Sequence, residues 1–366
     1  MRYLTLALLL WLLGAVPLLA AEYRSETLKE QDIRWFDAAG EPFRVYGLFA
    51  PDREHPCYYR VPGRVAETVS PVFAMLSRHT AGGRVRFATD SPYVAVHVTE
   101  ADGIPRTNLT LTFSNGLDLY VGKKQRYAGT YMPPEVSYEG FDGILYPEGG
   151  FRTVTLNMPR YAGVKELWIG LKEGSRLERA EDYRMEKPVV FYGSSITQGE
   201  CASRPGNTYE DIISRELDVN YVNLGFSGNA LGEQAVCDYI AGLDMSCFVM
   251  DYDHNAPSAE HLDKTHYNMY RTVRRAHRDL PVILVSRPNP VLNEDRRRRL
   301  DVIRATYDRA KREGDKHVYL VPGNEFMRGY SADAWTVDDT HPNDFGMVLM
   351  AKRLQTVLKP LLKGDK

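Results

Sequence analysis

The sequence lacks a marked excess of charge of either sign. Its 366 residues include 46 Lys and Arg and 48 Asp and Glu, which gives a formal net charge of −2 at pH 7. Proteins that bind nucleic acid usually carry a basic patch or a high isoelectric point, so this function is not favoured. The one basic run, four arginines at 296–299, lies between Glu294-Asp295 and Asp301. We expect it to form a solvated, salt-paired helix face.

Long apolar runs are also missing, except at the N-terminus. There Arg2 precedes an apolar stretch at 4–19, and Ala20-Ala21 offer small residues for cleavage. This pattern predicts a secretory signal peptide over residues 1–21. The stretch is short for a spanning helix, and a retained anchor is the alternative. We therefore expect a secreted or periplasmic protein, with no stable membrane insertion after the signal is removed.

Cysteine is scarce, with four in the whole chain: Cys57, Cys201, Cys237 and Cys247. Export permits disulfides, and four cysteines allow three full pairings. Cys237 with Cys247 is the pair to test first, and buried free thiols are equally consistent with the sequence. The cysteine spacing fits no common metal motif, and no glycine-rich phosphate loop is apparent. The sequence predicts neither a metal nor a cofactor.

The length exceeds that of a typical single domain and favours two. From 22 to 184, short apolar or alternating runs are separated by Gly, Pro, Asn and Asp, a pattern typical of antiparallel sheets. It predicts a jelly-roll-like β-sandwich. The expected strands lie at 43–48, 84–88, 94–98, 109–113, 151–156 and 166–171.

From 185 to 366 the pattern alternates between short β-branched runs and helical stretches. The expected strands lie at 189–192, 221–224, 247–250, 282–285 and 318–321. The expected helices lie at 208–217, 232–243, 259–278, 294–313 and 345–362. This order predicts a flavodoxin-like, doubly wound parallel sheet with helices on both faces. No flexible linker separates the halves, so we expect a packed interface, with the first domain supporting the site of the second.

Two segments carry the residue types of a serine hydrolase. Ser195 comes directly after the expected strand at 189–192, and Asp338 precedes His341 by three residues near the C-terminus. A serine hydroxyl needs a base to take its proton, and a histidine base works best when a carboxylate fixes its tautomer. Asp339 is the rival for that carboxylate. The pattern predicts ester hydrolysis.

Five short segments resemble one family. Gly-Ser-Ser-Ile-Thr-Gln-Gly at 193–199 is similar to the first block of the SGNH (GDSL-like) hydrolases. The segments at 223–228, 251–255 and 338–341 resemble its second, third and last blocks in the same order. Gly-Leu-Asp-Leu-Tyr at 116–120 is similar to the G-x-D-L-Y signature of a β domain that precedes one group of SGNH esterases.

The resemblance implies a role for individual residues. Ser195 would be the nucleophile, His341 the general base and Asp338 its orienting acid. The oxyanion hole would be formed by the backbone N–H groups of Ser195 and Gly228 and by the side-chain amide of Asn255. Gly225 is the alternative to Gly228.

Two departures from the family pattern bear on these roles. Ser194 stands where the family often has Asp, and Asp253-His254 replaces the usual glycine-rich approach to Asn255. The other histidines (His254, His261, His266, His277 and His317) lie outside the segment that resembles the last block. We expect them to be surface or packing residues.

Together, export and the resemblance imply removal of short acyl groups, acetyl above all, from an acylated carbohydrate. The alternatives are a lipid or aryl esterase, a thioesterase, or a catalytically silent carbohydrate-binding protein. Tyr120, Tyr127, Tyr131 and Tyr138 form either a sugar-stacking face or part of the β-domain core. Asn-Leu-Thr at 108–110 matches a glycosylation sequon, which matters only in a host that glycosylates.

Overall fold

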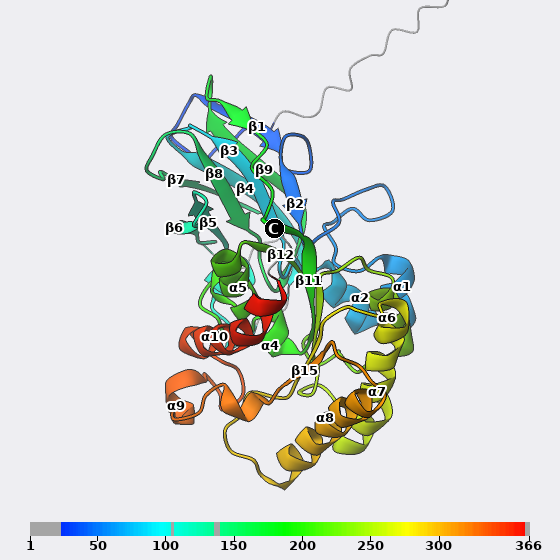
Figure 1. Ribbon diagram of the computed structural model, residues 1–366. Helices are drawn as coiled ribbons and strands as arrows, with labels where there is room; N and C mark the ends of the chain where they lie inside the picture. Colours follow the sequence, from blue (N-terminus) through cyan, green and yellow to red (C-terminus); the bar gives the residue numbers. More distant parts are fainter. Residues whose placement is uncertain (1–22, 104–105, 135–139, 363–366) are drawn as a thin grey trace, which may run out of the picture.

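A computed structural model describes residues 23–103, 106–134 and 140–362. Antiparallel sheets occupy one end of the molecule, and a parallel sheet with its helices occupies the other (Figure 1). The expected signal peptide and Tyr138 lie outside the described residues. None of the helices within the described ranges is both long and apolar enough to span a membrane.

The antiparallel strands form two sheets around a shared apolar core. The first sheet has the order β1 (Ile33–Asp37), β9 (Ala162–Lys172), β4 (Val94–Gly103) and β7 (Phe141–Leu145). The second has the order β10 (Leu177–Glu178), β3 (Arg84–Thr89), β8 (Arg152–Asn157), β5 (Leu117–Val121) and β6 (Arg126–Tyr131), and β2 (Arg44–Tyr46) pairs with β3. Side chains from both sheets pack into one cluster, for example Phe87, Val96, Leu119 and Ile169. The antiparallel domain is as expected, whereas its jelly-roll connectivity stays a prediction.

Three helices in this half were not predicted. Helices α1 (Gly63–Val69) and α2 (Pro71–Arg78) follow β2, and α3 (Leu111–Ser114) occupies the segment expected to be a strand at 109–113. Each of α2 and α3 begins at a hydroxyl cap. The Ser70 Oγ accepts from Phe73 N at 3.0 Å in α2, and Thr110 caps α3 in the same way. These caps satisfy backbone N–H groups that the start of a helix leaves unpaired, and they override the local β-like pattern.

The second half contains the expected parallel sheet. Its order is β12 (Val219–Gly225), β11 (Met185–Gly193), β13 (Cys247–Asp251), β14 (Val282–Val285) and β15 (Val318–Val321), with every neighbouring pair parallel. In chain order these are second, first, third, fourth and fifth, which is the flavodoxin-like arrangement. Ligands of such sheets bind beyond the carboxyl ends of the strands.

Helices cover both faces of this sheet. Helices α6 (Gln234–Ala241), α7 (Ala259–Ala276) and α8 (Glu294–Arg312) pack on one face, and α1 and α2 from the first half of the chain join the same cluster. The other face is covered by α4 (Ser195–Gln198), α5 (Tyr209–Leu217), α9 (Ala332–Trp335) and α10 (Asp344–Leu361). Short 3-10 turns, η1 (Pro205–Asn207) and η2 (Gly323–Glu325), lie in the connections. The core of the parallel domain is therefore built partly from the first half of the chain.

All four cysteines lie in the described residues, and each is buried and free. The pairing of Cys237 with Cys247 is not formed, because the two side chains face opposite sides of the sheet. Cys237 belongs to the cluster under α6 and α7, whereas Cys247 belongs to the cluster under α5 and α10. Of the two interpretations left open by the sequence, the structure shows buried thiols.

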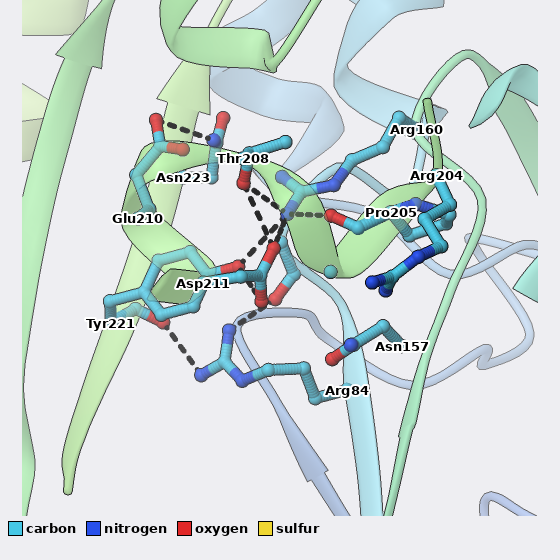
Figure 2. Close-up of polar contacts among 12 residues, drawn as sticks. Arg84, Asn157, Arg160, Arg204, Pro205, Thr208, Glu210, Asp211, Tyr221 and Asn223 are labelled. Carbon is cyan, nitrogen blue, oxygen red and sulfur yellow. Dashed lines mark hydrogen bonds and ion pairs between the residues drawn. The ribbon is translucent and has the colours of Figure 1, made fainter. Parts of the chain in front are cut away.

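Buried arginines of the first half join it to α5 and β12 (Figure 2). Arg160 forms an ion pair with Asp211 and donates to Thr208 Oγ1 at 2.8 Å. Arg84 donates through Nη2 to the carbonyl of Tyr221 at 3.0 Å. Burial of a charge is costly unless it is paired and hydrogen-bonded, so these contacts hold the two halves in one arrangement. The expected packed interface is present.

The G-x-D-L-Y signature also lies at this interface. Asp118 is fully buried, and its Oδ2 accepts from Arg204 Nη1 at 2.9 Å and from the backbone N–H of Gly206 at 2.8 Å. Arg204 and Gly206 flank the start of η1, which follows α4. Tyr120 is buried beside them, and its hydroxyl also receives a hydrogen bond from Arg204. The signature therefore fastens the loop that follows the expected nucleophile.

The tyrosines divide between core and surface. Tyr120 and Tyr131 are buried, and the Tyr131 hydroxyl donates to the carbonyl of Val94 at 2.9 Å. Tyr127 is exposed, but the guanidinium of Arg204 lies 4.0 Å from its ring centroid. The interpretation that these three tyrosines form a common sugar-stacking face is wrong, because two of them belong to the interior.

Candidate active site

Ser195 lies at the carboxyl edge of the parallel sheet. β11 ends at Gly193, and the Ser194 hydroxyl caps α4 by accepting from Ile196 N at 3.1 Å. A Cβ at position 193 would lie 2.0 Å from Thr197 Oγ1, so only glycine allows the helix to turn back this closely. The strand-to-helix turn places the Ser195 side chain at the sheet edge, 8% exposed.

His341 lies in the loop between α9 and α10 and contacts both expected partners. Its Nε2 is 2.9 Å from Ser195 Oγ, and its Nδ1 is 2.7 Å from Asp338 Oδ2. Asp338 Oδ1 also accepts from the backbone N–H of His341 at 2.8 Å. The rival, Asp339, instead donates its backbone N–H to Thr336 Oγ1 at 3.1 Å. The structure thus brings together Ser195, His341 and Asp338.

The protonation state of Asp338 fits this arrangement. Burial by itself would raise the pKa of its carboxyl group, but the hydrogen bonds and charge of His341, with a hydrogen bond from Asn108, lower the pKa to about 2. The ionised carboxylate accepts only, so Nδ1 of His341 carries the proton. Nε2 is then the acceptor for the Ser195 hydroxyl.

A second acidic group, Glu200, lies at the site and was not predicted. Its side chain is 1% exposed, and its Oε1 is 3.6 Å from His341 Nε2. Burial would raise the pKa of Glu200, but the charge of His341 and hydrogen bonds from Tyr161 and Asn108 outweigh it, so the pKa lies below its usual value. The site therefore holds two ionised carboxylates near one imidazole.

The first half of the chain reaches this site directly. Asn108 Nδ2 donates to Glu200 Oε1 at 3.0 Å and to Asp338 Oδ2 at 3.1 Å. Arg106 Nη1 lies 3.2 Å from both oxygens of Glu200, and the Tyr161 hydroxyl donates to Glu200 Oε2 at 2.7 Å. The first half supplies hydrogen-bond donors to both carboxylates.

The expected oxyanion donors lie on neighbouring loops. Gly228 follows β12 and has a φ of +70°, a conformation that favours glycine. The preceding residue, Ser227, donates its backbone N–H to Gln198 Oε1 of α4 at 3.0 Å. Asn255 Nδ2 donates to the carbonyl of Phe226 at 2.7 Å. The Gly228 turn is thereby fastened both to the helix of Ser195 and to Asn255.

Gly225, the alternative to Gly228, lies at the end of β12. Its backbone N–H donates to Asn223 Oδ1 at 2.9 Å, and a Cβ there would lie 2.2 Å from Gln198 N. This glycine is needed for close packing against α4, and its N–H already has a partner within the chain.

The arginine run at 296–299 is only partly the solvated face that we expected. Arg299 is buried and donates to the carbonyls of Asp253 at 3.1 Å and Ala256 at 2.9 Å. It also pairs with Asp295 at 2.8 Å. A buried guanidinium with five donors can bridge several acceptors, and here it fixes the loop that carries Asn255.

The remaining histidines, which we expected at the surface or in packing, have partners outside the group of Ser195, His341 and Asp338. His261 bonds to the carbonyl of Leu231 at 2.8 Å, and His277 bonds to the carbonyl of Ala241 at 2.9 Å. His266 bonds to the hydroxyl of Thr306 at 2.9 Å. His317 lies 3.9 Å from Asp279 at the surface. Burial and the charge of Arg287 hold the pKa of His254 far below its usual range.

Cys201, Asp338 and His341 offer one potential metal-ligand atom each within 4.8 Å of one another. The carboxylate and imidazole are hydrogen-bonded to each other, and the thiol is a poor ligand while protonated. Burial, together with the charges of Glu200 and Asp338, raises the pKa of Cys201 to about 12. This group therefore favours a hydrogen-bonded site over a metal centre.

A cavity of about 430 Å³ adjoins the site. Asn108 and Cys201 are among its lining residues, as are Val337, the chain neighbour of Asp338, and Phe345. Phe345 is 40% exposed, and its ring makes an edge-on contact with Tyr330 at 5.0 Å between centroids. An exposed aromatic surface therefore lies beside the acidic end of the site.

Residues 186–359 match the model of the "GDSL-like Lipase/Acylhydrolase family", and residues 33–177 match a model described as "N-terminus of Esterase_SGNH_hydro-type". No match was found among curated proteins.

Among solved structures, a putative GDSL-like lipase from Bacteroides ovatus is 28% identical, with a TM-score of 0.80 over 90% of this chain and 98% of that one. The salicylyl-acyltransferase SsfX3 from a tetracycline biosynthetic pathway is 18% identical, with a TM-score of 0.75 over 91% and 98%. A family two carbohydrate esterase from Clostridium thermocellum, in complex with cellohexaose, is 14% identical, with a TM-score of 0.63 over 87% and 99%. At these identities the last two show a shared fold only. With both halves matched by family models, the chain belongs to the GDSL-like (SGNH) esterases that carry a G-x-D-L-Y domain at the N-terminus.

Proposed function

We propose that the protein is an exported esterase that removes short acyl groups, acetyl above all, from carbohydrate through a triad of Ser195, His341 and Asp338. The observation that carries this proposal is the distance of 2.9 Å between Ser195 Oγ and His341 Nε2, with Asp338 on the opposite ring nitrogen at 2.7 Å. In this proposal the β domain of 22–184 and the catalytic domain of 185–366 act as one body.

In the first step, Ser195 Oγ attacks the ester carbonyl while His341 Nε2 takes the hydroxyl proton. The carbonyl oxygen gains negative charge, which the N–H groups of Ser195 and Gly228 and the amide of Asn255 stabilise. Loss of one such donor typically costs about 3–4 kcal/mol in the barrier. Asp338 stabilises the imidazolium that forms in this step.

The first half of the reaction ends when His341 gives this proton to the departing sugar oxygen, and the acyl group stays on Ser195. A water molecule then gives a proton to His341 as it attacks the acyl-enzyme. The carboxylic acid leaves, and Ser195 regains its proton. His341 therefore relays every proton in the cycle, between Ser195, the departing sugar oxygen and the attacking water.

The carbohydrate part of the proposal rests on two observations. One solved relative is a carbohydrate esterase in complex with cellohexaose. The cavity beside Asp338 also exposes Phe345, and sugar rings pack well against exposed aromatic faces. Phe345→Ala should therefore raise KM for an acetylated polysaccharide, while leaving turnover of 4-nitrophenyl acetate within about twofold.

An aryl esterase or an acyltransferase is the second candidate, because another solved relative is named a salicylyl-acyltransferase. Lipid esterase and thioesterase activities belong to the same test. Activity on 4-nitrophenyl esters of acetate, butyrate, octanoate and salicylate would separate these options. Faster turnover of the longer or aromatic acyl groups than of acetate would reject the acetyl preference.

The triad itself is tested by labelling and by substitution. Wild-type protein should take up a fluorophosphonate probe and release acetate from acetylated xylan or mannan. Ser195→Ala should remove both properties. His341→Ala should remove most activity at every pH, whereas His254→Ala, on the neighbouring loop, should keep it. Unlabelled wild-type protein that still binds the polysaccharide would instead indicate a catalytically silent binding protein.

A further inference from the structure

Glu200 occupies an unusual position for a buried carboxylate. It lies just after α4, five residues beyond the proposed nucleophile, and its donors come from different segments. They are Arg106, Asn108 and Tyr161 from the first half of the chain and Ser227 from the turn that carries Gly228. Ser227 Oγ donates to Glu200 Oε2 at 3.2 Å. Burial of a charged carboxylate costs free energy, and that cost is offset only where the carboxylate is fully hydrogen-bonded.

We infer that Glu200 is a positioning residue that stabilises the protonated form of His341 during acyl transfer and fixes the Gly228 turn relative to it. This inference rests on the proposed function. Its geometric basis is the 3.6 Å between Glu200 Oε1 and His341 Nε2, next to the 2.9 Å between His341 Nε2 and Ser195 Oγ. Across the shorter contact, His341 exchanges a proton with Ser195. Across the longer contact, the negative charge of Glu200 stabilises the protonated imidazole.

Glu200 does not act as a base in its own right. An ionised carboxylate has about four lone-pair positions, and Arg106, Asn108, Tyr161 and Ser227 already donate to Glu200. Because these donors hold both oxygens, Glu200 acts on the reaction through His341.

The charges that face His341 determine how strongly its protonated form is stabilised. From the loop between α9 and α10, Asp338 contributes one negative charge, and Glu200 contributes the second. Arg106, from the first half of the chain, contacts Glu200 at 3.2 Å and offsets part of its charge. Cys201 lies nearby but stays protonated, since burial raises its pKa to about 12. A negative charge this close to an imidazole stabilises its protonated form, and Arg106 offsets part of that stabilisation.

Two substitutions give effects of opposite sign. Glu200→Gln keeps the shape and removes the negative charge, so the protonated His341 is less stable. The acidic limb of kcat/KM for 4-nitrophenyl acetate should move to lower pH by about one unit, with kcat reduced about tenfold. Arg106→Met removes the offsetting positive charge at a partly exposed position, and the same limb should move to higher pH. Glu200→Asp keeps the charge and should leave the midpoint near the wild-type value.

These outcomes separate the inference from the function on which it rests. If Ser195→Ala and His341→Ala remain active, the proposed function itself is wrong. If both are inactive but Glu200→Gln and Arg106→Met leave the midpoint unchanged, the role of Glu200 is overturned and only its packing matters. Should Glu200→Gln fail to fold, a shift to higher pH in Arg106→Met still supports the inference, and no shift overturns it.

Discussion

Asn108 and Asp338 are 230 positions apart in the chain, yet the amide of Asn108 donates to the carboxylate of Asp338 at 3.1 Å. The same amide nitrogen donates to Glu200 at 3.0 Å. Asn108 is also the first residue of the only sequon noted in the sequence, and a glycan on this nitrogen would separate the amide from both carboxylates. Its role in the folded protein is therefore one of hydrogen bonding within the site.

Substitution of Asn108 should reduce activity, and a negatively charged replacement should reduce it more than a neutral one. Asn108→Ala removes donors to Asp338 and Glu200, and kcat should fall about tenfold, as expected for about 1.4 kcal/mol. Asn108→Asp places a third carboxylate beside two that are ionised, and like charges at this distance disfavour ionisation. Its activity should be lower still near neutral pH. Rates on 4-nitrophenyl acetate measure both variants. If Asn108→Asp is at least as active as Asn108→Ala, the prediction is wrong.

Neighbouring arginines on α8 should behave very differently when replaced. Arg299→Met removes one of the two arginines that pair with the buried Asp253, while Arg287 stays. It also removes the donor to the carbonyls of Asp253 and Ala256, and loss of one member of a buried pair typically costs up to about 3–5 kcal/mol. kcat should also fall, since Arg299 holds the loop of Asn255. Arg298 makes only an exposed contact with Glu260, so Arg298→Met should change the free energy of unfolding by less than about 0.5 kcal/mol. Urea denaturation of both variants tests the contrast, and equal effects would count against it.

A protein truncated to begin at Met185 should be insoluble. It would lack α1 and α2, whose Phe73 and Leu76 pack against the parallel sheet, and it would lack the arginines that hold β12. A matched protein that begins at Glu22 should be soluble and active. Soluble expression and size-exclusion chromatography measure this. Full activity of the truncated protein on acetylated polysaccharide would show that the first domain is dispensable.

The effect of Asp338→Asn on stability should depend on pH. The pKa of Asp338 in the folded protein is about 2, whereas an ordinary aspartate titrates near about 3.9. A lowered folded pKa contributes stability that is present above the unfolded value and is lost as pH falls through the folded value. The difference in free energy of unfolding between wild type and Asp338→Asn should therefore be full at pH 7 and shrink between about pH 4 and 2. A difference that stays constant across that range would contradict the assignment.

The parallel domain was largely predictable because its signals are local. Each β-branched run became a strand, and the predicted helix ends lie within a few residues of those of α5, α6, α7, α8 and α10. Strands buried on both faces need continuous apolar runs, and the sequence displays them. The D-x-x-H spacing likewise places Asp338 and His341 in one turn, so their contact could be expected.

Other features depend on partners far away in sequence. Ser70 followed by Pro71 is a recognisable helix start, but the apolar face of α2 packs on strands of the other half, and the period-two pattern around it favoured strands. Glu200 directly follows a recognised block, yet its donors Asn108 and Tyr161 come from distant segments. Arg299 appeared to be one of four equivalent arginines, and only the position of the Asp253 loop distinguishes it.

The position of α1 and α2 in the core of the parallel domain has a consequence during synthesis. Phe73 and Leu76 leave the ribosome well before β11, β12 and β13, against which they pack. At about 5–20 residues per second, their apolar side chains wait several seconds for the strands that cover them. Helices α1 and α2 therefore cannot reach their final packing until the chain has been made at least as far as β13. In the proposed export, the same delay would keep this part of the polypeptide unfolded for its passage across a membrane.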